Sequence, residues 1–444
     1  MTASAMKTGG IFAGWKVVGG AGVGIAFGSV LFATGGFAQL ANAWGHEFGW
    51  TQPQLAKAAT IYLFLQMLTY PVLGWMLDRW GSRKVALGSI AAFALSLLAL
   101  SRIGNSLAQL YAAFAFIGLV SAGTNVVSYA RAISLWFDRK RGMALGLAAG
   151  AQAVGGVLVP LMTARLIAAS GWSTAVLCLA LFELVVCLPL VALLVKDSPA
   201  PYGLLPDGAA PQAGAAVRAN AQPRLYGPSA GSAIRSAVFW KLALAFMVMG
   251  LTVYAVAINV VYILSQTAGM TPAEIAKLQA ATGAAVLLGR VGFGWLLDRL
   301  SAPVVGILAV AVAGGGIALY AFTAHPGAIL VGAMLLGAAA GGESDLMPYM
   351  ASRYFGTRAL SSVFGWFLAA FFVGAAIGPV AFAGIAAAQS SVITPLLLLL
   401  GLQAIPVLAF LSLGRYPTQG ELAQAERPGT GRRRGQAAKP AMAG

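Results

Sequence analysis

The sequence is poor in charged residues, and this shortage decides the class of protein. Asp, Glu, Lys and Arg make up only 9% of its 444 residues, whereas soluble domains have about 25%. Apolar residues make up 59%. Because a membrane-spanning helix needs about 20 mainly apolar residues, a chain of this length accommodates twelve such helices and no soluble domain beside them. We therefore expect an all-α membrane protein.

Residues that bind metals or form disulfides are also scarce. The chain has two cysteines and two histidines. Cys178 and Cys187 fall on one predicted helix at a separation of about 13 Å, which is too far for a disulfide. His46 and His325 fall in predicted external loops, and the sequence has no Gly-x-x-x-x-Gly-Lys-Ser/Thr motif for ATP. We expect no metal, no cofactor and no enzymatic activity.

A charged, glycine-rich stretch at residues 74–84 is the most informative feature that is present. It reads Gly-Trp-Met-Leu-Asp-Arg-Trp-Gly-Ser-Arg-Lys, and residues 294–299 repeat its first six positions with one conservative change, 220 residues further on. An ordered series of matches at nearly constant spacing predicts an internal duplication of half the chain. Further matched positions are Trp15 and Trp240, Trp136 and Tyr354, and Pro160 and Pro379.

The stretch at 74–84 resembles the loop between helices 2 and 3 of the major facilitator superfamily, and its repeat resembles the loop between helices 8 and 9. The repeat departs from the family pattern, because residues 300–303 have neither the glycine nor the basic pair. Phe-Gly-Trp at 48–50 and the basic cluster before residues 142–148 are similar to the monocarboxylate and oxalate/formate branch. The resemblance implies the superfamily fold, with twelve transmembrane helices in two pseudo-symmetric six-helix bundles.

Shifts in composition divide the chain into four parts. We expect an N-terminal six-helix bundle at 1–195, a Pro-rich cytoplasmic linker at 196–235, a C-terminal six-helix bundle at 236–413 and a basic tail at 414–444. The fifth helix begins near Gly142. The other predicted helices have these approximate bounds: 15–39, 57–77, 85–103, 107–131, 173–195, 238–265, 273–297, 304–324, 327–350, 360–388 and 392–413.

The basic residues predict how the chain crosses the membrane. When both ends are placed on one side, most Lys and Arg fall in the connections of that side, and only four fall opposite: Lys57, Arg102, Arg165 and Lys277. Because basic loops favour the cytoplasm, both termini are expected there. The net charge of +16 is then a topology signal and not a sign of nucleic-acid binding. We expect a monomer in a bacterial inner membrane, surrounded by membrane lipid.

Arg290 is the strongest candidate for substrate binding. It falls about two helical turns from the end of helix 8, and a charge at the centre of a membrane helix costs at least ~2.5–3.5 kcal/mol. The position matches the arginine with which carriers of the monocarboxylate and oxalate/formate branch hold a carboxylate, and a guanidinium fork suits that group. The alternative is a structural pair with an acid of helix 10.

Glu343 and Asp345 on helix 10 are the candidates for proton coupling. Their side chains diverge by about 200°, so both cannot line one cavity. A buried carboxyl can carry a proton, and a structural ion pair is the alternative. Two further intramembrane charges are less informative. Arg131 falls one turn from a helix end and can reach the interface, and we assign no role to Glu183.

Uncharged polar residues on helices 4 and 7 complete the candidate binding site. In the superfamily, helices 1, 4, 7 and 10 line the cavity, so the resemblance implies that polar residues there can hydrogen-bond a substrate. Hydrogen bonds between helices, worth about 0.6 kcal/mol each, are the alternative. The candidates are Asn125, Tyr129, Tyr254, Asn259 and Tyr262.

The repeated stretch is expected to act as a gate. In the superfamily the loop acid caps the facing helix 11, which begins here near Ser361 and Ser362, and the helix dipole favours an acid at that position. The basic residues of the loop latch the cytoplasmic side. The gate residues that the resemblance implies are Gly74, Asp78, Arg79, Gly81, Arg83, Lys84, Asp298 and Arg299.

The combined expectation is a secondary active transporter of a small organic monocarboxylate, moved with a proton by alternating access. A dianion is disfavoured because helix 11 has no lysine between Leu360 and Pro379. One alternative is an exporter of a drug or metabolite on the same fold, although residues 150–156 lack the proline of the exporters' helix 5 motif. Another is a non-transporting membrane sensor on the same scaffold.

Overall fold

Helices are the only regular elements in the part of the chain that the computed structural model describes, which is residues 12–32, 36–208, 225–418 and 421–422. The centre of the expected linker and most of the expected tail lie outside these residues. Within them, ten helical stretches are long and apolar enough to cross a membrane. They are Gln52–Trp80 (α4), Ser82–Leu100 (α5), Leu107–Trp136 (α6 and α7), Arg141–Leu194 (α8 and α9), Ala237–Ala268 (α11), Lys277–Leu297 (in α12, Pro272–Leu297), Ala302–Phe322 (α13), Pro326–Phe355 (α14), Leu360–Gln389 (α15) and Ile393–Leu411 (α16 and α17).

Two features reconcile these ten stretches with the twelve predicted helices. Arg141–Leu194 has 54 residues, which is about 80 Å of helix and more than twice the ~30 Å core of a bilayer. Gly171, with a φ of 79°, breaks it into helices 5 and 6. The first membrane segment is divided into Ala13–Ala26 (α1), Ser29–Leu31 (α2) and Phe37–Phe48 (α3), each too short to be a span by itself.

The first external loop is shorter than predicted. His46 and Glu47 belong to α3, which ends where Gly49 adopts a left-handed φ of 69°. Only residues 49–51 separate α3 from α4. The expectation that His46 lies in an external loop is therefore wrong.

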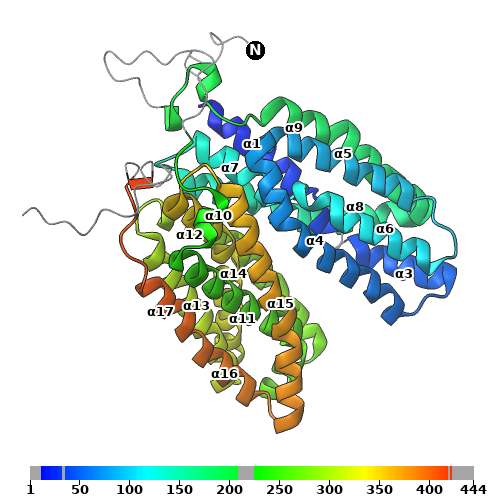
Figure 1. Cartoon of the computed structure of the whole chain (residues 1–444). Coiled ribbons are helices and arrows are strands. Elements are labelled where there is room, and N and C mark those ends of the chain that lie inside the picture. The colour runs from blue at the N-terminus through cyan, green and yellow to red at the C-terminus, as the bar shows by residue number, and fades with distance from the viewer. Residues whose placement is uncertain (1–11, 33–35, 209–224, 419–420, 423–444) are drawn as a thin grey trace, which may run out of the picture.

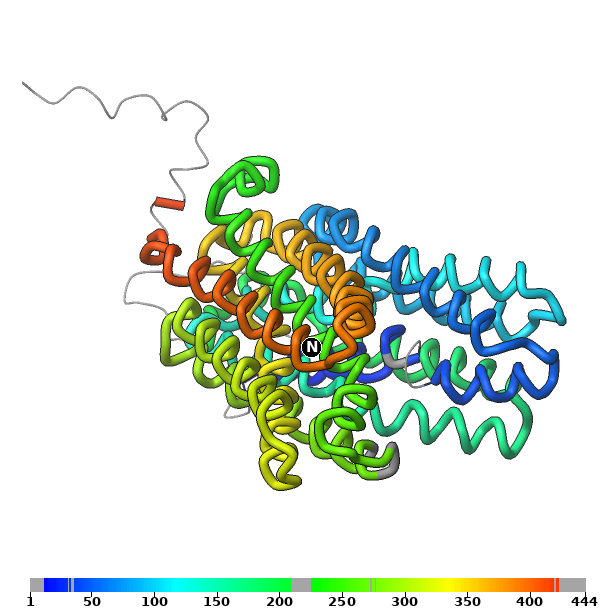
Figure 2. Tube along the Cα trace, turned by 90° about the horizontal axis from the view of Figure 1, so that it is seen from below, coloured from blue at the N-terminus to red at the C-terminus, as the bar shows by residue number. Residues whose placement is uncertain are grey.

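The helices form two groups that meet at one end of the molecule. Figure 1 shows α1 to α9 in one group and α11 to α17 in the other, and the view in Figure 2 shows the same separation. The groups converge where the linker, with its short helix Ala230–Ile234 (α10), joins them, and they diverge away from it. We call this the linker end and refer to the groups as the N-terminal and C-terminal bundles.

Helices 1 and 4 are both broken, and their breaks face each other. Helix 4 consists of Leu107–Val120 (α6), a 3-10 turn at Ser121–Thr124 and Val126–Trp136 (α7). At the break in helix 1, the backbone N–H of Ser29 donates to Thr124 Oγ1 (3.0 Å), and Ser29 Oγ donates to a carbonyl of the 3-10 turn. All these groups are buried. Backbone groups that lose their intrahelical hydrogen bonds within the membrane need other partners. Here each break supplies hydrogen-bond partners for the other.

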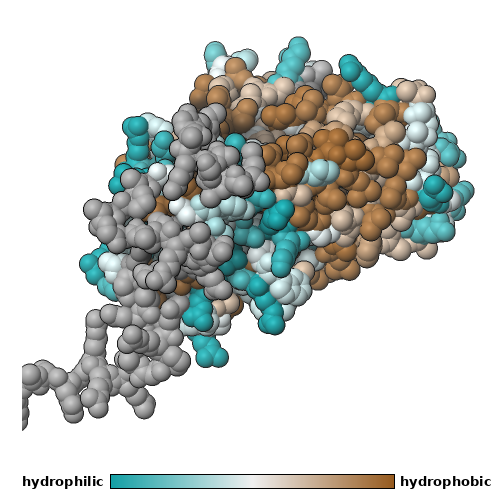
Figure 3. Space-filling view, turned by 90° about the horizontal axis from the view of Figure 1, so that it is seen from above, coloured by the Kyte–Doolittle hydropathy of each residue, from teal (hydrophilic) through white to brown (hydrophobic). Residues whose placement is uncertain are grey.

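The lateral surface is apolar. Figure 3 shows a broad brown area between hydrophilic residues. Large apolar side chains are well exposed on several outer helices, including Leu193, Val380 and Leu408. In water such a surface would be unusual, whereas lipid solvates it. The exposed surface and the long apolar helices together identify an integral membrane protein.

Candidate functional site

Two carboxylates, one from each copy of the repeated stretch, cap helices of the opposite bundle. Asp78, near the end of α4, accepts backbone N–H hydrogen bonds from residues 361–362 at the start of α15 (3.1 and 2.8 Å). Asp298, just after α12, accepts those of residues 142–143 at the start of α8 (2.6 and 2.9 Å). The helix dipole stabilises a negative charge in this position. The contact expected of Asp78 is therefore present, and the duplication produces it twice.

The cap at Asp298, which lies outside the membrane spans, combines two opposing electrostatic effects. Burial raises the pKa of this carboxyl above its ordinary value, while backbone hydrogen bonds from Met143 and Gly142 lower it. Contact between the bundles therefore desolvates the acid and supplies its hydrogen-bond donors in the same step.

Glycine lets the capped helices approach closely. A Cβ atom on Gly74 would clash with the backbone of Ser361, and one on Gly294 would clash with the backbone of Gly142. Helical backbone cannot move aside as the end of a flexible side chain can. Both copies of the stretch therefore need glycine four residues before the capping acid.

We expect Gly74→Val to hold the linker end open. An overlap of this kind costs about 1–3 kcal/mol, which shifts the ratio of closed to open states by roughly 5- to 150-fold. The measurement is thiol labelling of Ser361→Cys, which is buried when the end is closed, in a background without native cysteines. Gly292→Val is the matched control, because a Cβ there meets no atom within 4 Å. Equal labelling in both variants would contradict the steric role of Gly74.

The arginines of the repeated stretch stay within their own bundles. The guanidinium groups of Arg79 and Arg299 lie over the rings of Trp75 and Trp295, at 5.5 and 3.9 Å from the centroids. The Arg83 side chain donates to a carbonyl of helix 6 at 2.7 Å. None of these contacts crosses between the bundles, so the expected latch by these arginines is not seen in this structure.

For Gly81 and Lys84 likewise, no hydrogen bond or ion pair to the C-terminal bundle is described. Gly81 turns the chain from α4 into α5 with a φ of 88°, a conformation that favours glycine, and lies beside Asp197. Lys84 is exposed on α5. Their part in a gate therefore stays a prediction. The role that the structure shows for Gly81 is to form the turn between α4 and α5.

Other basic residues join the bundles at the linker end. Arg141 Nη1 donates to Ser352 Oγ at 2.9 Å, and Arg353 Nη1 lies 3.2 Å from Asp138 Oδ1. Asp207 of the linker accepts the backbone N–H groups of residues 138–140. The sequence reading missed these partners because a basic cluster in a loop is usually only a cytoplasmic anchor.

Arg131 does not reach the interface as expected. It is 7% exposed, donates through Nη1 to the Leu77 carbonyl at 3.0 Å, and lies 3.6 Å through Nε from Asp78 Oδ1. Its charge thus faces the carboxylate that caps α15. Arg131 belongs to the closed contact between the bundles and not to the membrane surface.

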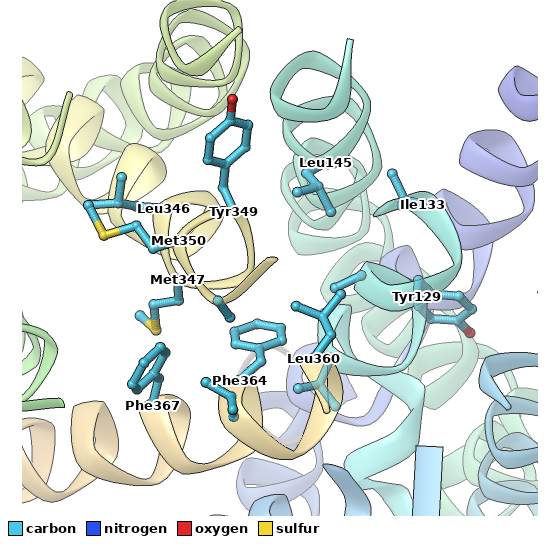
Figure 4. Close-up of a cluster of buried hydrophobic side chains, with 14 of the residues drawn as sticks. Tyr129, Ile133, Leu145, Leu346, Met347, Tyr349, Met350, Leu360, Phe364 and Phe367 are labelled. Atoms are coloured by element: carbon cyan, nitrogen blue, oxygen red, sulfur yellow. The ribbon is translucent and has the colours of Figure 1, made fainter. Parts of the chain in front are cut away.

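An apolar cluster seals the space behind these polar contacts. Ile133 and Leu145 of the N-terminal bundle and Met347, Leu360 and Phe364 of the C-terminal bundle are all at most 1% exposed and belong to one core. Figure 4 shows these side chains gathered between the two bundles. The bundles are therefore closed to water at the linker end.

Arg290 lies between the bundles, with a partner on each. Its Nη2 donates to Gln152 Oε1 of α8 at 2.8 Å, and its Nη1 lies 3.6 Å from Asp345 Oδ1 of α14. Arg290 is 7% exposed and Asp345 is fully buried. The predicted alternative, an ion pair with an acid of helix 10, is thus present. Gln152 was missed, because uncharged polar residues were considered only on helices 4 and 7, whereas Gln152 lies on helix 5.

A second group occupies the equivalent place in the other half of the duplication. Asn125 Nδ2 donates to the Tyr70 hydroxyl at 3.4 Å, and the ring of Tyr70 stacks on that of Phe372 with 5.7 Å between centroids. Tyr70 is nearly fully buried. This group also joins the bundles, because Tyr70 and Asn125 belong to the N-terminal bundle and Phe372 to α15.

The two groups match position by position at the spacing of the repeat. Adding 220 to 70, 125 and 152 gives 290, 345 and 372. We name them the aromatic group (Tyr70, Asn125, Phe372) and the charged group (Arg290, Asp345, Gln152). Tyr70 and Arg290 each precede their capping acid by eight residues, about 12 Å, which places both groups near the middle of a ~30 Å core.

The remaining predicted binding residues do not all gather here. The ring of Tyr254 lies 6.4 Å from that of Phe372, beside the aromatic group. Asn259 donates to carbonyls within its own bundle, which is the helix-to-helix bonding of the alternative. Tyr262 is 43% exposed. Tyr129 points away from the cluster in Figure 4, and its hydroxyl lies against α1.

Two further buried carboxyls belong to neither group. Glu343 is 2% exposed, and its Oε2 has no hydrogen-bond partner in the described structure. Glu183 begins a π-helical turn, Glu183–Cys187, in helix 6 and is 4% exposed. Among the described residues, no three His, Cys, Asp or Glu residues form a group that could hold a metal ion.

Comparison with known families decides where this architecture belongs. The profile described as Major Facilitator Superfamily matches residues 22–379, most of the chain. The chain belongs to the major facilitator superfamily. Members of this superfamily are transporters and not enzymes.

Relatives within the superfamily are found in fungi. The MFS transporter asaE of Aspergillus flavus is 26% identical over 298 residues, which cover 66% of this chain and 62% of the relative. The MFS-type transporter hasB of Aspergillus fumigatus is 28% identical over 312 residues, 67% of this chain and 65% of the relative. The fujikurins efflux protein of Gibberella fujikuroi is 30% identical over 127 residues, 28% and 26% of the two chains. The chain thus spans less than two thirds of these relatives.

Solved structures of the superfamily have the same fold. The human organic anion transporter MFSD10 (TETRAN) has a TM-score of 0.65 at 15% identity, with 89% of this chain and 99% of that chain covered. The fucose:proton symporter FucP of Escherichia coli has a TM-score of 0.63 at 12% identity, with 90% and 99% covered. At these identities the likeness shows the fold alone.

Proposed function

We propose that this superfamily member is a secondary active transporter of a small organic monocarboxylate, moved together with a proton. The observation that carries the proposal is Arg290, a buried guanidinium near the middle of the membrane with one partner on each bundle. A cation in this position is costly unless it is paired. Its fork suits a carboxylate, and the bundles that separate during alternating access are the ones it joins.

The composition of the charged group favours a substrate with a single negative charge. Arg290 is the one basic residue in it, and residues 360–379 add no lysine. A substrate carboxylate would replace the amide of Gln152 on the guanidinium. The rest of the substrate would face the aromatic group and Tyr254, which offer uncharged aromatic rings.

Asp345 supplies a physical route to proton coupling. The substrate carboxylate and Asp345 compete for the same guanidinium, which lies 3.6 Å from Asp345 in this structure. A buried carboxylate that loses its cation is costly, and uptake of a proton removes that cost. Anion and proton would then bind together. Glu343 is the second candidate because it is buried without a full set of partners.

Alternating access would use the contacts at the linker end. Every hydrogen bond between the bundles that the structure describes lies between Arg290 and that end. We place the linker end in the cytoplasm because most Lys and Arg lie there, so this state would be open to the outside. The relatives are fungal, so the expectation of a bacterial inner membrane has no support in the comparisons.

Export is the second candidate function. The fujikurins efflux protein shares 30% identity over 127 residues with this chain. A carrier driven by substrate gradients can run in either direction, so the same site would serve both. Direction is then set by the gradients and by coupling, and not by the fold.

Uptake into vesicles tests the proposal. Purified protein is reconstituted, and labelled monocarboxylates, dicarboxylates and neutral analogues are offered with and without a pH gradient, with empty vesicles as control. We expect monocarboxylates to accumulate when the outside is acidic, and dicarboxylates to be excluded. Absence of transport for every acid, in both directions, would favour a sensor on the same scaffold.

A further inference from the structure

A groove runs along the side of the N-terminal bundle, turned away from the other bundle. Its volume is about 540 Å³. Met76 of the groove lies two residues after Gly74, about 200° around α4, so the groove and the gate use opposite faces of this helix. The lining residues are Thr69, Leu73, Met76, Trp80, Lys84, Val85, Gly88, Ser89, Ala92, Leu119, Val120, Ala122 and Gly123.

Small residues make the groove open and deep. Gly88 is exposed, and a Cβ placed on it would meet no atom within 4 Å. The floor is the broken part of helix 4, where a Cβ on Gly123 would clash with the side chain of Ser89. The walls are aliphatic side chains such as Leu73 and Val85. The groove is therefore an apolar slot on a surface that faces lipid.

The length of the groove matches one leaflet. Residues 69 and 80 mark its ends on α4, eleven residues or about 16 Å apart. Half of the ~30 Å hydrocarbon core is about 15 Å. One acyl chain lying along α4 would therefore fill the slot from the headgroup level toward the middle of the membrane.

The mouth at the linker end carries a cation and an indole. Trp80 is 49% exposed, and tryptophan favours the headgroup level. Lys84 is exposed beside it, and no hydrogen bond or ion pair is described for its ammonium group. Asp78, the nearest acid on α4, is turned toward α15. The mouth thus offers the exposed ammonium group of Lys84, on α5, and the exposed indole of Trp80, at the end of α4.

We propose that this groove binds an anionic phospholipid of the leaflet at the linker end. One acyl chain lies between α4 and α5, and the phosphate lies at Lys84. A lysine near an anionic lipid surface contributes about a fivefold preference, and the slot adds apolar contact. The site is independent of the substrate site, because it lies on the opposite face of α4.

Lipid binding to the full chain tests this site. Native mass spectrometry of the purified protein is used to titrate phosphatidylglycerol and phosphatidylcholine with identical acyl chains. We expect phosphatidylglycerol to bind more tightly. Lys84→Gln is expected to weaken phosphatidylglycerol about fivefold and leave phosphatidylcholine unchanged, while Gly88→Leu fills the slot and weakens both lipids.

Matched variants separate the site from the general surface. Lys16→Gln removes another exposed lysine, and Gly401→Leu adds the same side chain at an exposed glycine of helix 12 that has no atom within 4 Å of its Cβ position. Neither control is expected to change lipid binding. Equal binding of the two lipids to the native chain, or losses in Lys84→Gln and Gly88→Leu no larger than in their controls, would overturn the proposal.

Discussion

Arg290→Ala is expected to abolish transport of carboxylates. Removing one partner of a buried, hydrogen-bonded charge pair costs about 2–5 kcal/mol, which is roughly a 30- to 5,000-fold loss of affinity. Part of that loss reflects Asp345, which would be left buried without its cation. The measurement is substrate affinity in detergent together with uptake in vesicles, so that binding and translocation are read separately.

A double variant distinguishes loss of binding from loss of stability. Arg290→Ala combined with Asp345→Asn removes both buried charges, so we expect the thermal stability lost in the single variant to return while binding does not. Arg290→Lys keeps the charge but loses the planar fork, and we expect affinity to fall at least about tenfold. Transport by Arg290→Lys at the native level would rule out the binding role.

Asp345→Asn is expected to uncouple transport from the proton gradient. When one proton accompanies one anion, a difference of one pH unit sustains about a tenfold accumulation. The variant has no carboxyl to protonate at this position, so we expect accumulation to vanish while exchange of substrate between the two sides continues. Exchange is measured as counterflow without a pH gradient.

Glu343→Gln is the companion measurement. Glu343 is buried on the same helix, and no ion pair between it and Arg290 is described. If Glu343 is structural, its amide variant keeps accumulation and loses at most stability. Loss of accumulation in Glu343→Gln and not in Asp345→Asn would move the coupling role to Glu343, and retention in both would end the proton proposal.

Much of the fold follows from the sequence, because apolar runs of membrane length have few alternatives. The predicted start of helix 11 at 360 agrees with α15, which begins at Leu360. The breaks were not predicted. Residues 121–125 read Ser-Ala-Gly-Thr-Asn, and small residues of this kind serve equally well in a packed membrane helix. Only the facing break in helix 1 shows why the interruption is stable.

The charged members of the site could be predicted, but among the neutral residues only Asn125 and the neighbouring Tyr254 were predicted. Arg290 and Asp345 stand out because charge is costly in lipid. Gln152, Tyr70 and Phe372 carry no such signal, since polar and aromatic residues are common in membrane helices. The duplication held the missing information, because the 220-residue spacing applied to Arg290 leads directly to Tyr70.

Contacts of the basic loop residues were harder to predict for a physical reason. Arg79 and Arg299 each follow a tryptophan by four residues, and stacking on it needs no movement of the bundles. A sequence shows which residues are basic, but it does not show which of several nearby partners each basic side chain contacts. Arg141 and Arg353, each within reach of Asp138, take the bridging role instead.

The two aspartate caps accept hydrogen bonds from backbone amides. The contact between the bundles therefore tolerates substitutions at the residues that donate these N–H groups. Every amino acid except proline supplies the N–H that Asp78 and Asp298 accept. Evolution can therefore exchange side chains at 143, 361 and 362, within the room that Gly74 leaves, and retune neighbouring helices for a new cargo. Asp78 and Asp298 cannot be exchanged in this way, because their side chains are the acceptors. The duplicated protein can therefore change its substrate site and keep the same two contacts between the bundles.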